Sequence, residues 1–301
     1  MARRASVSPR RRRTRPEAAG RTLHRLMAEQ LAVIAANERR ALQGSVEALH
    51  DVRVALRRIR SLAATFAKLD REFLERLDRR IAKVCDRMGA ARDMDVWITL
   101  LRGLIQAGGL DPVPVRDRRA ALAVLRRQRT HLAHDALTCG LFRRVKTMLR
   151  KRLRRAPPGR KNAPGAPVFV ARRMLAVRES IAARYRRVGN FSKGPAHDLR
   201  RAGRRLRYLA EFFAPELGRE CVRAGHWITK AQAALGKMHD CDSALELSQG
   251  LPSGAARRAV RRALARRRAA QLRKFKTAWR HYADRRLQTT WLARLAAAAA
   301  E

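Results

Sequence analysis

Apolar residues recur every three or four positions along almost the whole chain, which is the period of amphipathic helices. The first stripe begins at Leu23 and stops at the pair Gly44 and Ser45. No segment shows the alternation of apolar and polar residues that is typical of a β-strand. The pattern therefore predicts an all-α protein, with helices over about 23–43, 46–69, 72–105, 116–154, 168–188, 196–214, 219–247 and 255–286.

Glycine and proline clusters divide this helical pattern into two parts. The segment 108–114 reads as a loop, and Gly140 is a candidate break inside the long basic helix. The clearest linker is 156–167, which is rich in proline and glycine. The sequence thus predicts a disordered basic arm at 1–19, two tandem four-helix bundles at 20–155 and 168–286, and an alanine-rich helix or tail at 287–301.

Parts of the first half return in the second at a fixed offset of 147 residues. Three pairs of segments match at this offset: His50–Arg60 with His197–Arg207, Gly89–Asp95 with Gly236–Asp242, and Leu125–Arg129 with Leu272–Lys276. The first pair is the most faithful, because one histidine, one aspartate and four arginines return in place. A long internal repeat of this kind predicts two similar halves in one assembly.

The net charge changes the picture from a simple helical protein to one that needs a partner. The chain carries 70 Lys+Arg against 25 Asp+Glu, a formal charge of +45 that is spread along the whole length. Self-repulsion on this scale destabilises a compact state unless anions are bound. Arginine outnumbers lysine, which suits bidentate contact with phosphate, although a GC-rich genome gives the same bias. We therefore expect a polyanion as the partner.

The repeated segment forms a row of cations when it is drawn as a helix. His50, Arg53, Arg57 and Arg60 lie at i, i+3, i+7 and i+10 on one face, opposite a row of apolar residues. The segment 197–207 reproduces this arrangement. Like charges at this spacing destabilise an isolated helix, so something must compensate them.

Two kinds of compensation are open. One is internal, through pairing of the row arginines with four repeated aspartates across a helix–helix interface: Asp93, Asp95, Asp240 and Asp242. The other is a phosphate chain lying along the row. His197 follows Pro195 closely, so we expect it in the first helical turn, where free backbone N–H groups bind anions. His50 is expected about one turn after Ser45.

These residues resemble the CHAD family, the conserved histidine α-helical domain. The first row reads His-x-x-Arg-x-x-x-Arg-Arg-x-Arg, and the second continues through Tyr208, Glu211, Phe212 and Phe213. The segments 89–95 and 236–242 resemble the Gly-x-x-Arg/His-Asp-x-Asp elements of the family. The resemblance covers roughly residues 20 to 286.

The resemblance implies two bundles related by a pseudo-twofold axis, with a basic groove or pore between them. It further implies binding of inorganic polyphosphate and association with polyphosphate granules. The anion ligands that it implies are His50, Arg53, Arg57, Arg58, Arg60, His197, Arg200, Arg204, Arg205 and Arg207. The repeated basic segments add Arg201, Arg126 and Arg273. Arg204 stands where the family often has lysine, which keeps the charge.

Three functions compete at this point. Non-enzymatic polyphosphate binding leads, since phosphate chains lack bases and the four tryptophans lie in apolar contexts, apart from the motif arginines. Nonspecific DNA or RNA binding through backbone phosphates is the runner-up, and the basic arm favours weak binding of this kind. A metal-dependent polyphosphate-processing enzyme is less favoured, because only the aspartate pairs resemble metal ligands. The CYTH triphosphate-hydrolysing domain that often accompanies this family is also absent from the sequence.

The remaining features set the expected location. Cys85, Cys139, Cys221 and Cys241 form no CxxC motif and no zinc spacing, so we expect reduced thiols and no metal or other cofactor. No apolar stretch is long enough to cross a bilayer, and no apolar core follows the basic N-terminus as a signal peptide requires. These features give the cytoplasm as the expected location, and the resemblance to the CHAD family implies polyphosphate granules within it.

Overall fold

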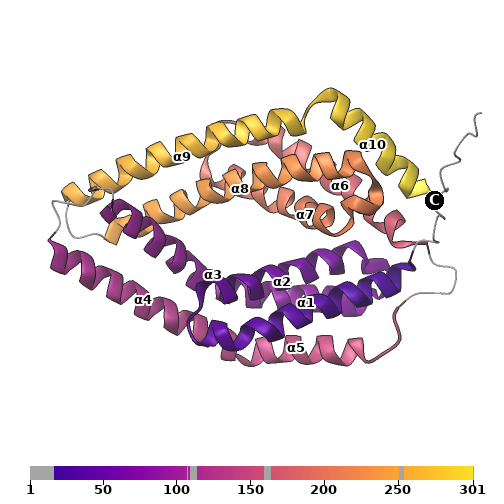
Figure 1. Cartoon of the computed structure of the whole chain (residues 1–301), viewed down its shortest axis with the longest axis horizontal. Coiled ribbons are helices and arrows are strands. Elements are labelled where there is room, and N and C mark those ends of the chain that lie inside the picture. Colours follow the sequence, from indigo (N-terminus) through magenta and orange to yellow (C-terminus); the bar gives the residue numbers. More distant parts are fainter. Residues whose placement is uncertain (1–16, 107, 109–113, 159–163, 251–253, 301) are drawn as a thin grey trace, which may run out of the picture.

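The computed structural model describes residues 17–300 apart from 107, 109–113, 159–163 and 251–253. The regular elements in these ranges are helices, and the predicted all-α fold is confirmed (Figure 1). The α-helices are α1 Ala19–Leu42, α2 Val46–Thr65, α3 Arg71–Gln106, α4 Val115–Thr138, α5 Gly140–Leu153, α6 Ala166–Arg187, α7 Lys193–Leu217, α8 Arg219–Leu247, α9 Gly254–Tyr282 and α10 Arg285–Ala300. Short 3₁₀ turns follow α2 and α8 at Ala67–Leu69 and Ser248–Gly250.

The helix boundaries at the end of each half differ from the predicted ones. The long helix predicted over 116–154 breaks at Cys139, as the glycine at position 140 indicated, and Cys139 caps α5 by accepting a hydrogen bond from the Phe142 amide through its Sγ. In the second half the break falls a few residues before the predicted end at 286. Asp284 caps α10 there by accepting from the Leu287 amide at 2.9 Å. The described part of each half therefore contains five α-helices, which is one more than predicted for the first half, whereas α10 lies where the alanine-rich helix or tail was predicted.

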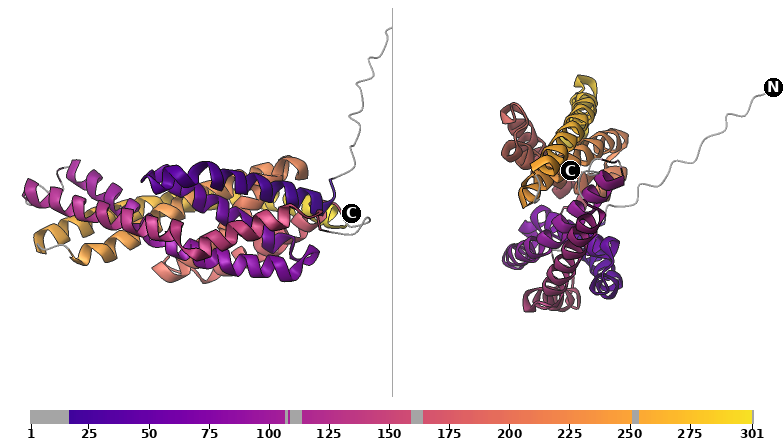
Figure 2. Two further views of the ribbon diagram at one scale, coloured as in Figure 1. Left: turned by 90° about the horizontal axis from the view of Figure 1, so that it is seen from below. Right: turned by 90° about the vertical axis from the view of Figure 1, so that its left-hand side faces the viewer.

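The two halves lie side by side with their helices in the same order (Figures 1 and 2). Within the first half α1, α2 and α3 pack in succession, and α3 also contacts α4 and α5. The second half repeats this plan, with α8 against α7, α9 and α10. Between the halves α1 meets α6, α2 meets α7 and α3 meets α8, so that each of these helices contacts its own counterpart. The two cation rows, on α2 and α7, are thereby brought to the same interface.

A continuous apolar core joins the halves. The apolar face of α2 that was predicted opposite the row is buried, with Val52, Leu56 and Ile59 fully inaccessible. Phe66 at the end of α2 lies 5.8 Å from Phe169 of α6 between ring centroids, and it also contacts Phe213 of α7. Burial of a phenylalanine at such a position is worth about 3–5 kcal/mol relative to alanine. The halves therefore fold around shared side chains.

The start of α1 is held against both described ends of the predicted linker. Gly20 lies so close to the Pro158 carbonyl that a Cβ on it would be 1.6 Å from that oxygen. The Ala166 amide donates to the Glu17 carbonyl at 3.3 Å, next to an isolated antiparallel bridge between Ala18 and Gly165. The linker thus returns the chain to the point where α1 begins.

The turn before each cation-row helix contains a residue with a positive φ at the same repeat position. Gly44 has a φ of 98° and Phe191, which is 147 residues later, has a φ of 59°. A left-handed conformation is easy for glycine but unfavourable for phenylalanine. Phe191 is held there by packing, since its ring lies 5.2 Å from that of Phe275. The repeat therefore includes the turns as well as the rows.

Candidate anion-binding site

The centre of the interface between α2 and α7 holds four arginines, which we call the cation cluster: Arg53, Arg57, Arg200 and Arg204. Arg53 is 4% exposed and the other three are half-buried. Arg57 of α2 lies close enough to Arg200 and Arg204 of α7 to lower the pKa of both. The two rows that the sequence predicted thus meet across the interface, at equivalent positions of the repeat.

The cluster is short of negative charge. Burial, followed by repulsion from Arg57, lowers the pKa of Arg204 to about 9 and that of Arg53 to about 10. The Nη1 atom of Arg53 is buried and has no hydrogen-bond partner among the described residues. A buried guanidinium group without an acceptor is costly, so the cluster is electrostatically incomplete without an anion.

Helices α3 and α8 bring a second pair of equivalent groups to the cluster. Arg92 and Asp93 of α3 correspond to His239 and Asp240 of α8. Burial raises the pKa of Asp93 and Asp240, while Arg53 opposes this shift at Asp93 and Arg200 opposes it at Asp240. These two carboxylates therefore offset only part of the local positive charge.

The histidines lie at the edge of the same region. His50 and His197 are each the fifth residue of their helix, so the expectation that His197 occupies the first turn is wrong. The helix begins before Pro195, which is tolerated in the first turn because its missing N–H has no intrahelical partner there. Burial lowers the pKa of both histidines, with Arg92 adding to the effect at His50 and Arg200 at His197.

Sequence reasoning passed over His239, which is the partner of His197. The Nδ1 atoms of the two rings are 3.5 Å apart. Burial and then the charge of Arg200 lower the pKa of His239 to about 4. The signal was present in the sequence, because His239 stands at the repeat position of Arg92.

Three predicted ligands are engaged by carboxylates. Glu211 of α7 accepts from Arg58 of α2 at 2.7 Å and lies 3.3 Å from Arg207 of its own helix, so it joins the two halves. Arg60 is bound by Asp78 of α3 at 2.7 Å. These arginines have less charge to offer an external anion than the cation cluster has.

The other predicted ligands lie farther out. Arg201 and Arg205 are on the exposed side of α7, and the charge of Arg201 contributes to the lowered pKa of His197. Arg126 on α4 and Arg273 on α9 are exposed. Within the described residues neither of these two forms an interaction with the cation cluster.

The proposed pairing of the repeated aspartates with the row arginines is wrong for two of them. Asp95 is bound by Arg129 of α4 at 2.8 Å, with both side chains almost completely buried. Asp242 is bound in the same way by Arg268 of α9 at 2.7 Å. Asp93 and Asp240, although they face the row arginines, make no ion pair within 4 Å in the described part of the chain.

These two ion pairs also correct the third sequence match. Arg129 donates to the Gly44 carbonyl, and Arg268 donates to the Phe191 carbonyl, so the two arginines are equivalent. They are separated by 139 residues rather than 147. The match of 125–129 with 272–276 is therefore out of register, because the second half is shorter before α9.

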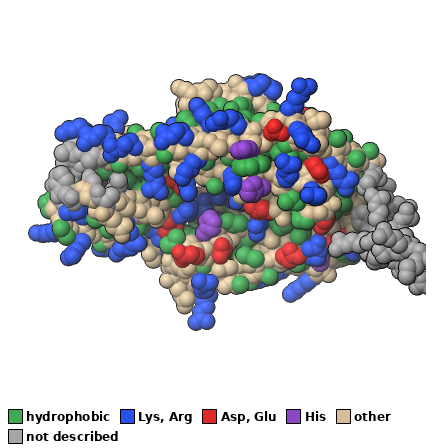
Figure 3. Space-filling model, turned by 45° about the horizontal axis from the view of Figure 1, so that its top comes forward, with side chains coloured by type: hydrophobic (Ala, Val, Ile, Leu, Met, Phe, Trp, Pro, Cys, Tyr) green, Lys and Arg blue, Asp and Glu red, His purple; other side chains and the backbone are tan. Residues whose placement is uncertain are grey.

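The surroundings of the cluster are rich in basic residues, although the carboxylates of Asp93, Asp240 and Glu211 also lie there. Many lysine and arginine side chains are visible on the face shown in Figure 3, with carboxylates among them and histidines near its middle. Among the described residues no group of three or more histidine, cysteine or carboxylate side chains is placed to hold a metal ion. None of the described helices is long and apolar enough to cross a membrane.

Comparisons with known proteins agree with this architecture. The crystal structure of the CHAD domain from the plant Ricinus communis is similar with a TM-score of 0.62 and 24% identity, covering 94% of this chain and 93% of that one. PptA from Streptomyces chartreusis is similar with a TM-score of 0.65 and 18% identity, covering 88% of this chain and 100% of that one. The comparison with curated proteins gives no match. A family model described as CHAD domain matches residues 25–249, and the chain therefore belongs to the CHAD domain family.

Proposed function

We propose that this protein binds inorganic polyphosphate without catalysing a reaction, with the phosphate chain lying along the cation cluster between α2 and α7. The buried Nη1 of Arg53, which has no acceptor among the described residues, is the observation that carries the proposal. A phosphate oxygen is the kind of acceptor that a guanidinium group binds best. Placed there, it would also relieve the repulsion among the four arginines.

The arrangement suits a linear anion better than a compact one. Arg53 and Arg57 are one helical turn apart, as are Arg200 and Arg204, so each helix offers cations at intervals of roughly 6 Å. The two helices present these intervals to the same interface. Successive phosphate groups of one chain would therefore meet successive arginines. In the cell we expect the protein at polyphosphate granules.

The chemistry of the carboxylates supports binding rather than catalysis. Hard cations such as Mg²⁺ need several converging oxygen ligands. Asp93 and Asp240 have raised pKa values and face arginines, which compete with a metal ion for them. Phosphate release from polyphosphate in the presence of Mg²⁺ or Mn²⁺, abolished by Asp93→Asn with Asp240→Asn, would overturn this part of the proposal.

A pair of matched double variants tests the site. Arg57→Gln with Arg204→Gln removes two charges from the cluster, and Arg11→Gln with Arg12→Gln removes two from the N-terminal arm, which lies outside the described residues. We expect the cluster variant to bind long-chain polyphosphate much more weakly at about 0.15 M salt, where exposed charges are screened. The arm variant should bind nearly as well as the unchanged protein. Equal losses would show diffuse attraction without a site.

Duplex DNA as competitor tests the runner-up function. At matched phosphate concentration and the same salt, we expect duplex DNA to leave most of the polyphosphate bound. Efficient displacement by DNA would instead favour a nucleic-acid backbone as the partner.

A further inference from the structure

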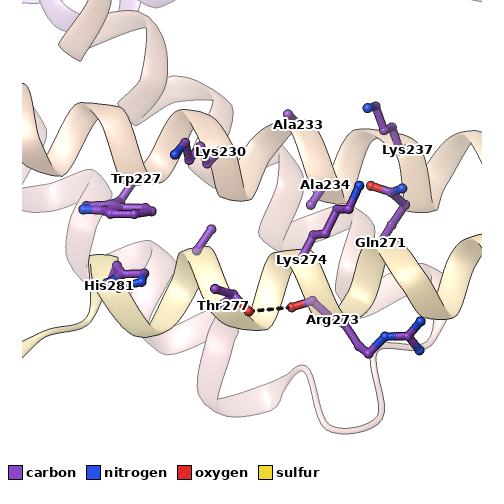
Figure 4. A pocket seen from close by; sticks show the side chains of 11 residues that line it. Trp227, Lys230, Ala233, Ala234, Lys237, Gln271, Arg273, Lys274, Thr277 and His281 are labelled. Carbon is purple, nitrogen blue, oxygen red and sulfur yellow. Dashed lines mark hydrogen bonds between the residues drawn. The ribbon is translucent and has the colours of Figure 1, made fainter.

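The second half contains a groove between α8 and α9 that the cation cluster does not use (Figure 4). Its volume is about 560 Å³, within the range of small-molecule sites. On α8 it is lined by Trp227, Lys230 and Lys237, with alanines between them. On α9 the corresponding positions include Lys274 and His281.

The lining residues follow one face of each helix. Trp227, Lys230 and Lys237 lie at i, i+3 and i+10, and Gln271, Lys274 and His281 have the same spacing on α9. The helices are antiparallel, so the beginning of one series meets the end of the other. Ten residues of helix give the groove a length of roughly 15 Å.

One end of the groove is aromatic. The indole of Trp227 stacks on the imidazole of His281 with 4.1 Å between ring centroids and an interplanar angle of 15°. The exposed Lys230 ammonium lies 4.7 Å from the centroid of the indole ring. The lining also includes the small side chains of Ala233, Ala234 and Ala278, which leave room for a flat group. Trp227 packs against the apolar core, as the sequence indicated, but a histidine and a lysine also contact its ring.

The other end of the groove is cationic. Lys237, Arg273 and Lys274 lie there, next to the side-chain amide of Gln271. Among the described residues no carboxylate lines the groove. The first half has carboxylates at two equivalent positions. Asp86 occupies the repeat position of Ala233, and Asp135 occupies that of Lys274.

We propose that this groove binds a nucleotide, with its base next to the Trp227–His281 stack and its phosphates at Lys237 and Lys274. An aromatic platform joined to cations is the combination that recognises a base carrying phosphate. Inorganic polyphosphate would use only the cationic end. The base would displace the flexible Lys230 side chain from the indole face. Because Asp86 and Asp135 occupy the equivalent positions in the first half, the site is restricted to the second half.

The test uses the full chain with Arg57→Gln and Arg204→Gln, so that the cation cluster holds phosphates less tightly. ATP and inorganic tripolyphosphate are titrated at about 0.15 M salt by calorimetry. We expect ATP to bind at least about tenfold more tightly than tripolyphosphate, since stacking of one base contributes a factor of this order. Trp227→Leu should reduce ATP to the affinity of tripolyphosphate. Lys237→Gln with Lys274→Gln should weaken both ligands.

The matched control, Arg261→Gln with Arg262→Gln, removes two exposed charges from α9 outside the groove. It should leave ATP binding unchanged. Circular dichroism checks that each variant is folded. Equal affinities for ATP and tripolyphosphate, or ATP binding that Trp227→Leu does not change, would overturn the proposal. An oligoadenylate of eight nucleotides shows whether the natural ligand is a free nucleotide or a single-stranded nucleic acid. If it binds far more tightly than ATP, the groove is assigned to single-stranded nucleic acid. If the two bind similarly, the groove is assigned to free nucleotides.

The result is separable from that for polyphosphate. Loss of polyphosphate binding in the cluster variant with ATP binding retained would support two independent sites. Loss of ATP binding in that same folded variant would show that ATP occupies the cluster, and would reject the groove.

Discussion

Arg129 of α4 donates from its Nε to Oδ1 of Asp95 on α3 at 2.8 Å, and the two side chains are 5% and 2% exposed. Its guanidinium group also donates to the Gly44 carbonyl, in the turn before α2. One side chain thus fixes the position of α3, of α4 and of the turn that leads into the first cation row.

The first prediction concerns this ion pair. Asp95→Ala leaves the Arg129 charge buried without its carboxylate, so we expect the free energy of unfolding to fall by about 3–5 kcal/mol. Asp242→Ala should cost less, because Arg268 and Asp242 are 22% and 11% exposed. Denaturant unfolding followed by circular dichroism measures both. Glu29→Ala, which removes the exposed partner of Arg25, is the control and should cost less than about 1 kcal/mol. Equal effects of Asp95→Ala and Glu29→Ala would contradict the assignment.

The second prediction compares two helical glycines. Gly20→Ala places a Cβ against the Pro158 carbonyl, so the backbone must shift and we expect a loss of about 1–3 kcal/mol. Gly103→Ala in α3 meets no atom within 4 Å and should stabilise the helix by about 0.5–1 kcal/mol. The melting temperatures of the two variants should therefore shift in opposite directions from that of the unchanged protein. A shift in the same direction would mean that the contact at Gly20 is not tight.

The third prediction concerns stability without a ligand. Because burial and Arg57 depress the pKa of Arg204, the charged form is disfavoured in the folded state. Arg57→Gln with Arg204→Gln should then raise the free energy of unfolding by on the order of 1 kcal/mol in ligand-free buffer. Added polyphosphate should stabilise the unchanged protein more than the variant, since only a ligand of the folded state raises the melting temperature. A variant that is less stable in both conditions would show that these arginines contribute to the fold.

The fourth prediction concerns acid sensitivity. His239 takes up a proton at a pKa of about 4 in the folded state and near 6.5 when unfolded. The unfolded state therefore binds more protons between these values, and stability falls as the pH falls from about 6.5 towards 4. His239→Gln should lose less melting temperature between pH 7 and pH 5 than the unchanged protein. His131→Gln, at an exposed position, is the control. Identical pH profiles for all three proteins would remove His239 as a contributor.

The helices and the cation rows were accessible to sequence reasoning because both depend on short-range periodicity. The row at His50–Arg60 needed only the helical period to become a face, and the offset of 147 placed a second face on the equivalent helix. The family followed from the same residues, and the matching family model confirms it. The position at which α9 ends was harder to predict, because the break before α10 depends on the cap that Asp284 provides.

The partners of the carboxylates could not be predicted in this way. Asp95 pairs with Arg129 and Asp242 with Arg268, and these two arginines are related by a different offset from that of the aspartates. The second half is shorter before α9, so residues of α9 are equivalent to residues of α4 at an offset of 139. The match of basic residues at an offset of 147 concealed this change. The groove beside Trp227 was equally hidden, since its two sides come from helices that only the fold brings together.

The turns at Gly44 and Phe191 have a consequence for how duplicated proteins are compared. Glycine and phenylalanine share nothing as residue types, yet both hold a left-handed backbone and offer a carbonyl to an equivalent arginine. In both turns the carbonyl group of this residue accepts a hydrogen bond from the equivalent arginine. The positive φ and the bond from carbonyl to arginine therefore identify the two turns as equivalent at a position where the residue types alone do not.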